Sequence, residues 1–495
     1  MRGAAPPAPS PARRRPLALS VLSRRLERVT DSASPRTAAP SSETPSFPPE
    51  RLQVLRTRVA ELMPGVRSDL EALTRIPSVS LPSFDQRHVD ESAEATAALL
   101  RAEGLEVEIV REGGAPAVIG HVDGPPGAPT VMLYAHHDVQ PPGEREDWDS
   151  EPFEPVERDG RLYGRGAADD KAGIMAHVAA LRAHAGELPV GVTIFVEGEE
   201  EVGSDSLATI LERHGDKLAA DAIVLADSTN WAVGEPALTT TLRGMIRVVA
   251  RVTTLDHSIH SGMYGGPVPD ALTALVRLLA SMHHDDGSLA VEGLRGSQAS
   301  PLDYEEARLR EESGMLPDTQ VLGSGDLLSQ LWTQASITTI GIDAPSVDKA
   351  SNTLAASAAA KISMRLAPDE DPQDGFAALK RHLEAHVPWG ARLEVTLDDE
   401  GAGFAAQADG PVYDLARAAF ADAWGTEPVD IGVGGSIPFV AAFAERFPDA
   451  AILVTGVEDP DTRAHGANES LHLGEFERVC LAETVLLARL GAHRG

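Results

Sequence analysis

Five side chains of the types that bind divalent metals stand at the ends of apolar segments in this sequence. They are His136, Asp169, Glu201, Asp227 and His465. Few structural reasons would place carboxylates and imidazoles so consistently where buried strands stop. Neutral imidazole nitrogen and carboxylate oxygen are ligands that zinc takes in catalytic sites. The pattern therefore predicts a two-metal hydrolase site.

The first apolar segment, 131–135, reads as a buried strand that leads into His136, His137 and Asp138. Side chains alternate between the two faces of a strand, so His136 and Asp138 should share one face and His137 the other. A metal-bound histidine is usually oriented by a carboxylate. We expect His136 to be a ligand and Asp138 to orient it, although a hydrogen-bonded polar strand end explains this segment equally well.

Residues 164–171 crowd two glycines, two aspartates and a lysine against the start of a predicted helix that ends near Gly186. An Asp before a helix commonly caps it, and capping alone could account for Asp169. The additional charges make a simple cap a less complete explanation. A carboxylate at this point could bridge two cations.

A β-branched segment, 191–196, breaks into the acidic run Glu197-Gly198-Glu199-Glu200-Glu201. Adjacent carboxylates usually form a solvated loop, but these directly follow a strand. A hydrolytic metal site needs a ligand and a separate general base that removes a proton from water. The run can supply both, and Asp227 and His465, at the ends of two other apolar segments, complete the set.

Four blocks of sequence resemble the dinuclear zinc metallopeptidases that include carnosinase, cytosolic nonspecific dipeptidase, glutamate carboxypeptidase, acetylornithine deacetylase and succinyl-diaminopimelate desuccinylase. The blocks are Tyr134-Ala-His-His-Asp-Val-Gln-Pro, Gly164-Arg-Gly-Ala-Ala-Asp-Asp-Lys, Glu197-Gly-Glu-Glu-Glu-Val-Gly-Ser and His465-Gly-Ala-Asn-Glu. The resemblance covers nearly everything after residue 50 and is closest to the dipeptidase branch. Four blocks in the same order are specific, whereas one block alone would be weak.

The resemblance implies a role for each residue of the site. It makes His136 and either Glu201 or Asp227 terminal ligands, Asp169 the bridge and His465 a ligand of the second metal. It makes Glu200 the general base and Asp138 the residue that orients His136. Glu199 and Glu200 could also be read as the base and ligand, but the following Val202-Gly203-Ser204 favours Glu200 and Glu201. The family also implies a cis peptide between Asp169 and Asp170.

The expected fold is an α/β catalytic domain, with a mostly parallel central sheet flanked by helices, interrupted by an inserted α+β lid and dimerisation domain. After Asp227, three segments alternate as half-buried strands: 240–252, 361–366 and 392–397. Two segments between them, 269–282 and 375–386, are predicted to be helical. We predict a disordered extension over 1–45 and a catalytic domain in two parts, 46–239 and 399–495. The lid and dimerisation domain, 240–398, lies between these two parts.

The resemblance also implies substrate-binding residues. His260 would reach the active site of a partner chain, and Arg365 would bind the substrate carboxylate through its planar fork. Gly435 and Ser436 lie in a turn that the family places at the substrate. Two differences from the family affect substrate preference: Val433 stands where relatives often have a charged residue, and Asn352-Thr353-Leu354-Ala355 replaces a more usual Ile-Pro ending.

Composition is that of a large soluble enzyme. The net charge of -32 argues against a nucleic-acid partner. No apolar stretch approaches the ~20 residues of a membrane span, so no membrane partner is expected. Cys480 is the only cysteine and cannot form an intrachain disulfide, which favours a cytoplasmic location. The first 45 residues are rich in Pro, Ala, Ser and Arg and read as disordered.

These observations predict metal-assisted hydrolysis of dipeptides or short peptides with a free C-terminal carboxylate, by a homodimer that binds two divalent ions per chain. Zinc is the expected metal, with manganese or cobalt possible. A deacylase of N-acyl amino acids would use the same site with a different acyl pocket. Two further alternatives are a protein that binds amino-acid derivatives without hydrolysis and an adaptor with a disordered tail. Neither function needs the general base and the five metal-type residues.

Overall fold

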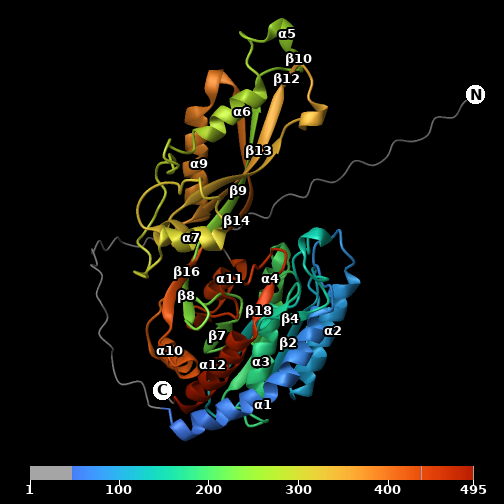
Figure 1. Ribbon diagram of the computed structural model, residues 1–495, viewed down its shortest axis with the longest axis vertical. Helices are drawn as coiled ribbons and strands as arrows, with labels where there is room; N and C mark the ends of the chain where they lie inside the picture. Colours follow the sequence, from blue (N-terminus) through green and yellow to red (C-terminus); the bar gives the residue numbers. More distant parts are fainter. Residues whose placement is uncertain (1–46, 436, 494–495) are drawn as a thin grey trace, which may run out of the picture. The chain divides into compact units, whose positions relative to one another are not determined.

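The computed structural model describes residues 47–435 and 437–493. The predicted extension over 1–45 and the expected substrate residue Ser436 lie outside these ranges. The described strands form a central sheet, a lid sheet and two small sheets, and the larger elements are labelled in Figure 1.

The central sheet has nine strands in the order β1-β2-β6-β3-β7-β17-β8-β15, with β16 paired to β8. Its strands are β1 (Glu106–Val110), β2 (Ala117–Val122), β3 (Thr130–His136), β6 (Gly191–Glu197), β7 (Ala222–Leu225), β8 (Ala237–Leu242), β15 (Phe404–Ala405), β16 (Val429–Val433) and β17 (Ala451–Val454). The middle strands β6, β3, β7 and β17 are mutually parallel. Strands β1, β2 and β15 pair antiparallel towards the edges, and β8 is antiparallel to β17. The expected α/β class is confirmed, and its parallel part is the middle of the sheet.

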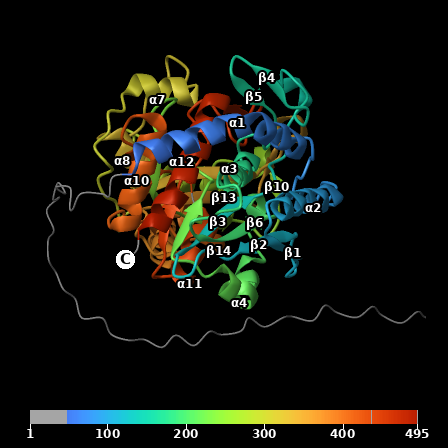
Figure 2. The ribbon, with the colours of Figure 1, turned by 90° about the horizontal axis from the view of Figure 1, so that it is seen from below.

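Helices cover both faces of the central sheet, which explains the continuous apolar strands. Along β3, Val131, Leu133 and Ala135 belong to one hydrophobic cluster, while Met132 and Tyr134 belong to the other. Figure 2 shows α1, α3 and α12 on one side of the sheet and α4 and α11 on the other. The packing helices are α1 (Pro49–Thr74), α2 (Arg87–Ala102), α3 (Lys171–Ala183), α10 (Pro411–Trp424) and α12 (Leu473–Ala492) on the first side, and α4 (Leu207–Leu218) and α11 (Pro438–Arg446) on the second.

Helix α3 fixes the segment that carries Asp169, because it is buried on almost all sides. Its His177 contacts Glu483 of α12 at 2.9 Å through Nδ1 and the Tyr134 carbonyl of β3 at 2.9 Å through Nε2. The helix is thus tied to the sheet below it and to the helix beside it. The start of α3 can therefore shift little relative to β3.

The lid sheet is antiparallel, in the order β11-β13-β9-β14. Its elements and the short ones around it are β9 (Gly244–Thr253), β10 (Ile259–His260), α5 (Ser261–Tyr264), α6 (Ala271–Ala280), α7 (Glu306–Ser313), α8 (Leu327–Trp332), β11 (Ser336–Asp343), β12 (Thr353–Leu354), β13 (Ser357–Leu366), α9 (Pro372–His386) and β14 (Arg392–Gly401). Helices α6 and α9 share one hydrophobic cluster with the lid sheet. The alternation in β9 and β13 reflects this one-sided burial.

The expected single strand over 240–252 is two strands. Strand β8 ends at Leu242 in the central sheet, and β9 begins at Gly244 in the lid sheet. The chain changes sheet at Arg243, whose guanidinium donates through Nε to the Gly434 carbonyl at 3.0 Å. It returns between Gly401 and Phe404. The predicted domain limits remain predictions.

A small sheet, β18-β5-β4, joins distant parts of the chain beside the central sheet. It consists of β4 (Val156–Arg158), β5 (Arg161–Tyr163) and β18 (Ser470–His472). Strand β18 follows the loop that carries His465, so its pairing with β5 brings that loop to the segment before Asp169. None of the described helices has the length and apolar character needed to cross a bilayer.

Candidate metal centre

The site residues gather where parallel strands of the central sheet end. His136 is the last residue of β3, and its register partner is Glu197, the last residue of β6. Asp227 follows β7 by two residues, and His465 lies in the loop after β17. Because β6, β3, β7 and β17 run in the same direction, their carboxyl ends meet at one edge of the sheet, where open α/β sheets bind ligands.

Asp169 lies between the two histidines. Its Oδ1 is 3.1 Å from Nε2 of His136, and its Oδ2 is 3.1 Å from Nε2 of His465. Asp170, not Asp169, occupies the N-cap position of α3, and its Oδ2 accepts the backbone N–H of His136 at 3.2 Å. The peptide between the two aspartates is cis. Capping therefore does not account for Asp169, whose two oxygens face two different imidazoles.

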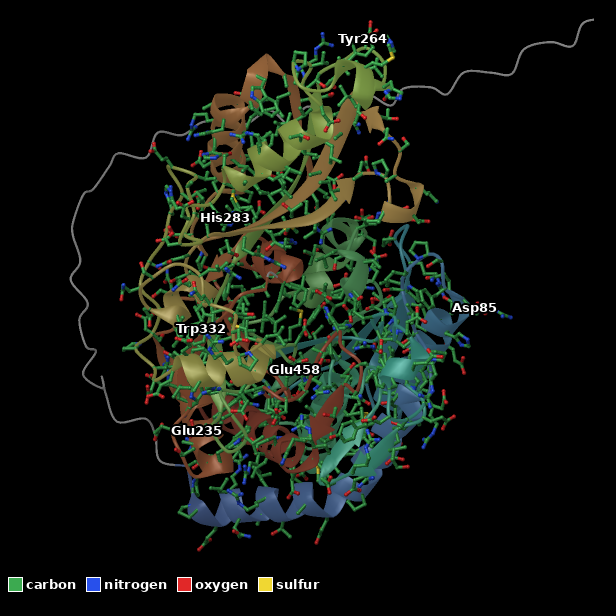
Figure 3. The ribbon with its side chains drawn as sticks, turned by 45° about the horizontal axis from the view of Figure 1, so that its top comes forward. Asp85, Glu235, Tyr264, His283, Trp332 and Glu458 are labelled. Carbon is green, nitrogen blue, oxygen red and sulfur yellow. The ribbon has the colours of Figure 1, made fainter. Side chains whose placement is uncertain are left out.

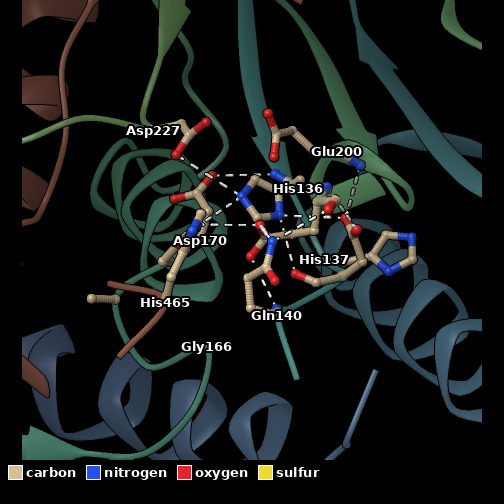
Figure 4. A network of polar contacts seen from close by, with 12 residues as sticks. His136, His137, Gln140, Gly166, Asp170, Glu200, Asp227 and His465 are labelled. Atoms are coloured by element: carbon tan, nitrogen blue, oxygen red, sulfur yellow. Dashed lines mark hydrogen bonds and ion pairs between the residues drawn. The ribbon is translucent and has the colours of Figure 1, made fainter. Parts of the chain in front are cut away.

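The remaining two carboxylates divide between the histidines. Asp227 Oδ1 lies 3.9 Å from His136 Nε2, and Glu201 Oε2 lies 3.3 Å from His465 Nε2. Figure 4 shows His136 in the middle of this network, with Asp227 and His465 beside it and His137 turned away. The sequence left open whether Glu201 or Asp227 accompanies His136. Asp227 lies within ion-pair distance of His136, whereas Glu201 lies within reach of both histidines.

This donor set fits two divalent cations. Groups of three potential ligands, His136 with Asp169 and Glu201 or His136 with Asp170 and Asp227, have their ligand atoms within 4.8 Å of one another. Imidazole and carboxylate are the ligands of catalytic zinc. Several carboxylates in a largely buried site also carry negative charge that cations would compensate.

The three adjacent glutamates have different surroundings. The Glu199 carboxylate accepts the backbone N–H groups of Ser206 at 2.6 Å and of Ala115 at 2.8 Å. Glu201 accepts the backbone N–H of Gln140 at 3.0 Å and its Nε2 at 2.7 Å. The Glu200 carboxylate makes no hydrogen bond or ion pair with any other described residue. Glu199 is thus occupied as a structural group, which favours the register with Glu200 as base and Glu201 as ligand.

Asp138 connects the end of β3 to the acidic run. Its Oδ1 lies 3.4 Å from Nδ1 of His136, and that ring nitrogen also contacts the Asp138 carbonyl at 3.1 Å. The same carboxylate accepts the backbone N–H groups of Glu200 at 3.2 Å and Glu201 at 3.1 Å. Through the contact with His136, Asp138 could orient that ring. The link to Glu200 and Glu201 was not expected from the sequence.

Electrostatics at the site are dominated by burial and by charge crowding. Burial, together with neighbouring Asp169 and Glu201, raises the pKa of Asp227 to about 7. Burial also raises the pKa of Glu200 well above its usual value, and Asp227 adds to this shift. Contacts with Asp169 and Glu201 raise the pKa of His465 to about 11. Without bound cations, protons therefore compensate part of the acidic charge.

Glu469 is a supporting residue that sequence reasoning missed. It is fully buried, and its Oε2 accepts Nη1 of Arg165 at 2.6 Å and the N–H of Gly166 at 3.1 Å. Its Oε1 accepts the N–H groups of Ala168 at 3.0 Å and Asp169 at 3.2 Å. Glu469 closes the block that begins at His465, so one short segment supplies both a metal-type side chain and the clamp for the Asp169 loop. The only signal in the sequence was the glutamate at the end of that block.

Glu458 is a second residue that sequence reasoning missed. It is half-buried in the segment after β17, and its backbone is paired with that of Thr229. Burial, and then the nearby carboxylates of Asp169 and Asp227, raise its pKa well above the usual value. No sequence motif marks this position.

The expected substrate residues lie apart from this cluster. His260 is exposed in the lid, and its Nδ1 accepts the N–H of Gly262 at 3.0 Å. Figure 1 shows β10, which carries His260, grouped with β12 and α5 at one end of the lid. No contact joins His260 to the five metal-type residues in the described part of the chain.

Arg365 and Gly435 are brought to one region. Arg365 of β13 is the register partner of Ser336 of β11, and Arg243 donates to the Ser336 hydroxyl at 3.0 Å. Arg243 in turn donates to the Gly434 carbonyl, next to Gly435. Two neighbouring cations beside a glycine turn form a suitable surface for an anion.

Comparisons with known proteins agree with this geometry. The model of a family described as peptidase family M20/M25/M40 matches residues 132–488. A cysteinylglycine-S-conjugate dipeptidase of Corynebacterium striatum is 33% identical over 431 residues, covering 85% of this chain and 94% of the relative. A Beta-Ala-His dipeptidase of Rattus norvegicus is 29% identical, covering 72% of this chain and 76% of the relative. The crystal structure of human carnosine dipeptidase 1 matches with a TM-score of 0.78 at 24% identity, covering 90% of this chain and 100% of that chain, which shows a common fold.

Proposed function

Because the chain belongs to peptidase family M20/M25/M40, we propose that it hydrolyses the amide bond of dipeptides that carry a free C-terminal carboxylate, with the help of two divalent metal ions. The observation that carries the proposal is the position of Asp169, which offers one carboxylate oxygen to each of two histidines at 3.1 Å. The names of the two similar relatives, one acting on cysteinylglycine S-conjugates and one on Beta-Ala-His, support dipeptides as the substrate class.

The proposed ligands form two sets that share Asp169. His136 and Asp227 belong to the first set, and His465 and Glu201 to the second. Zinc suits this mixture of nitrogen and oxygen ligands, and manganese or cobalt could replace it. Bound there, two such ions would polarise the scissile carbonyl and lower the pKa of an attacking water toward ~7.

Glu200 is the proposed general base. Its carboxylate has no competing hydrogen bond among the described residues, and Asp138 holds its backbone N–H at 3.2 Å. It accepts a proton from the attacking water and returns one to the leaving amine, a role usually worth 10²–10⁴-fold in rate. Asp138 orients the His136 ring at the same time.

The substrate carboxylate is proposed to bind at Arg365 and Gly435 and at Ser436, which lies outside the described residues. The link of Arg365 and Arg243 through Ser336 supports an anion at this point. In the bound dipeptide, the free C-terminal carboxylate would lie at these residues while the scissile carbonyl lies at the metal site. The C-terminal residue of the dipeptide would then lie on the side of the lid strand β13.

The active form is proposed to be a homodimer in which His260 completes the site of the partner chain. The exposed position of His260 supports this proposal, since no described residue of its own site contacts it. Strand β11 is an edge of the lid sheet and exposes Ile340 (52%) and Ile342 (46%), which leaves an edge available for pairing. His260 could then stabilise the oxyanion that forms during hydrolysis. The lone, buried Cys480 is in keeping with a reducing, cytoplasmic setting.

A substrate panel tests the proposed function. The protein would be loaded with Zn²⁺, Mn²⁺ or Co²⁺ and assayed with dipeptides and with N-acetyl and N-succinyl amino acids. We expect dipeptides to be hydrolysed with higher kcat/KM than N-acyl amino acids, and chelation to abolish the activity. A preference for N-acyl amino acids would instead identify a deacylase, and activity that survives chelation would contradict metal-dependent hydrolysis.

A further inference from the structure

A cavity of about 290 Å³ lies between loops of the central sheet and helices α7 and α8. Its apolar walls are formed by Trp231, Tyr304, Leu328, Leu331, Trp332 and Val433. Trp332, at the end of α8, is labelled in Figure 3. The volume is small for a whole ligand, since such pockets usually measure about 300–1,000 Å³, but it is ample for one large side chain.

The aromatic wall of the cavity is held in a fixed arrangement. The ring of Trp231 meets that of Trp332 at a centroid distance of 6.0 Å and that of Tyr304 at 5.8 Å. The Arg308 guanidinium lies 3.9 Å from the Trp231 ring centroid and pairs with Glu312 at 2.6 Å. The cation–π contact holds the Trp231 ring in place and covers one of its faces. Arg308, Glu312 and Arg243 add charged groups to a lining that is otherwise largely apolar.

The rim of the cavity is formed by segments that also carry the candidate metal site. Thr229 and Asn230 closely follow Asp227, Gly434 directly precedes Gly435, and Pro460 lies in the segment leading to His465. Thr229, Asn230 and Pro460 follow β7 and β17, whose carboxyl ends lie at the edge of the sheet that holds the metal-type residues, and Thr229 is paired with Glu458 across this edge. Gly434 follows β16, which runs in the opposite direction. The cavity therefore adjoins the candidate active site.

Two glycines allow the backbone at the end of β16 to approach helix α8 closely, and this close approach forms one side of the cavity. A Cβ on Gly432 would come within 2.6 Å of the Trp332 Cβ, and a Cβ on Gly434 within 2.8 Å of the Leu331 carbonyl. Arg243 donates to the Gly434 carbonyl and to Oγ of Ser336 at 3.0 Å, which fastens the end of β16 to the start of β11. The close approach that shapes the cavity is thus specified by these residues.

We propose that this cavity binds the side chain of the N-terminal residue of the substrate and favours a bulky apolar group, such as an aromatic ring or an S-substituted cysteine. This proposal rests on the proposed dipeptidase function. The N-terminal residue carries the scissile carbonyl, which must lie at the metal site. Its side chain is therefore the one nearest to Thr229 and Asn230, at the rim beside Asp227.

The test uses two substrates that differ only in this side chain, Ala-Gly and S-benzyl-cysteinylglycine. We expect the wild type to show a kcat/KM for the second at least roughly tenfold above that for Ala-Gly, since each methylene bound in an apolar pocket is worth ~10-fold or more. Leu331→Phe fills the cavity and should lower this ratio at least tenfold. Tyr304→Leu changes a half-buried wall position without filling the cavity and should also lower this kcat/KM ratio.

Leu316→Phe is the matched control, because Leu316 is 72% exposed and lies outside the cavity. It should leave the ratio unchanged. The cavity assignment is overturned if neither Leu331→Phe nor Tyr304→Leu changes the ratio, or if they change selectivity only in a Gly-X series, where the bulky group is on the C-terminal residue. Both results still require dipeptide hydrolysis, whereas a wild type that hydrolyses no dipeptide with any metal contradicts the proposed function itself.

Discussion

The candidate metal centre and the lid both carry polar residues with proposed roles in catalysis but hold them in different ways. At the metal centre, backbone N–H groups from distant segments bind the carboxylates of Asp138, Glu199, Glu201 and Glu469. In the lid, the exposed His260 accepts one hydrogen bond, from a residue two positions away. The first arrangement is fixed before any ligand binds, and the second depends on what approaches it.

This contrast separates two kinds of contribution to catalysis. Side chains that must hold fixed geometry around metal ions need a rigid support, because preorganised groups lose little free energy on binding. A side chain that must move towards the substrate can stay on an exposed element. Substitutions at the metal centre should therefore abolish binding or chemistry, and substitutions in the lid should depend on assembly.

The largest effect is expected for Asp169→Ala. One carboxylate faces both histidines, so its loss should weaken both metal positions and remove nearly all turnover. Elemental analysis after gel filtration should find far less than the two ions per chain expected of the wild type. Asp461→Asn, an exposed acid in the loop before His465, is the control and should keep both ions. Full occupancy in the Asp169 variant would contradict the shared-ligand geometry.

Glu200→Gln should keep both metals and the fold but lower kcat by ~10²- to 10⁴-fold, because the amide cannot accept the proton of the attacking water. Glu199→Gln should act differently. Its carboxylate binds two backbone N–H groups, so its substitution should lower the melting temperature more than it lowers kcat. Steady-state kinetics and thermal unfolding of the two variants separate these roles. The reverse pattern would shift the base by one residue.

Mixing two inactive variants examines the lid. If His260 serves the partner's site, chains carrying Glu200→Gln and chains carrying His260→Ala should regain activity when mixed. Random exchange would give about half of the dimers one of each chain, and each of these has one intact composite site. Activity near a quarter of the wild-type value would be expected. Mixed chains that exchange subunits but stay inactive would place His260 outside the partner's site.

The smallest effect concerns pH. The Asp227 carboxyl has a pKa of about 7, and His465 a pKa of about 11, in the metal-free protein. A cation must displace the Asp227 proton below pH 7 and the His465 proton throughout the working range, so metal affinity should rise with pH. Isothermal titration at pH 6 and pH 8, in buffers of different ionisation enthalpy, should show tighter binding at pH 8 and proton release. Affinity that is constant with pH would contradict these pKa shifts.

The sequence predicted which residues form the site more successfully than it predicted which of them contact each other. His136 and Asp227 were found because apolar strands precede them, and a strand's end is readable from local pattern. The pairing of Asp227 with His136 depends on β3 lying next to β7, and no local pattern carries strand order. The structural role of Glu199 likewise depends on Ala115, 84 residues away.

Supporting residues were harder still to find from the sequence. Glu469 and Arg165 form a buried ion pair across 304 residues, and either alone reads as an ordinary surface charge. The prediction of a single strand over 240–252 was wrong for a related reason. Its alternation is compatible with two strands in different sheets, and only the tertiary contacts of Arg243 separate them.

Anomalous diffraction from crystals grown with Zn²⁺ tests the central claim most directly. The account predicts two peaks per chain, separated by roughly 3.5–4 Å, with Asp169 between them, His136 and Asp227 on one and His465 and Glu201 on the other. A single peak at full occupancy, or two peaks that do not share Asp169, would contradict it.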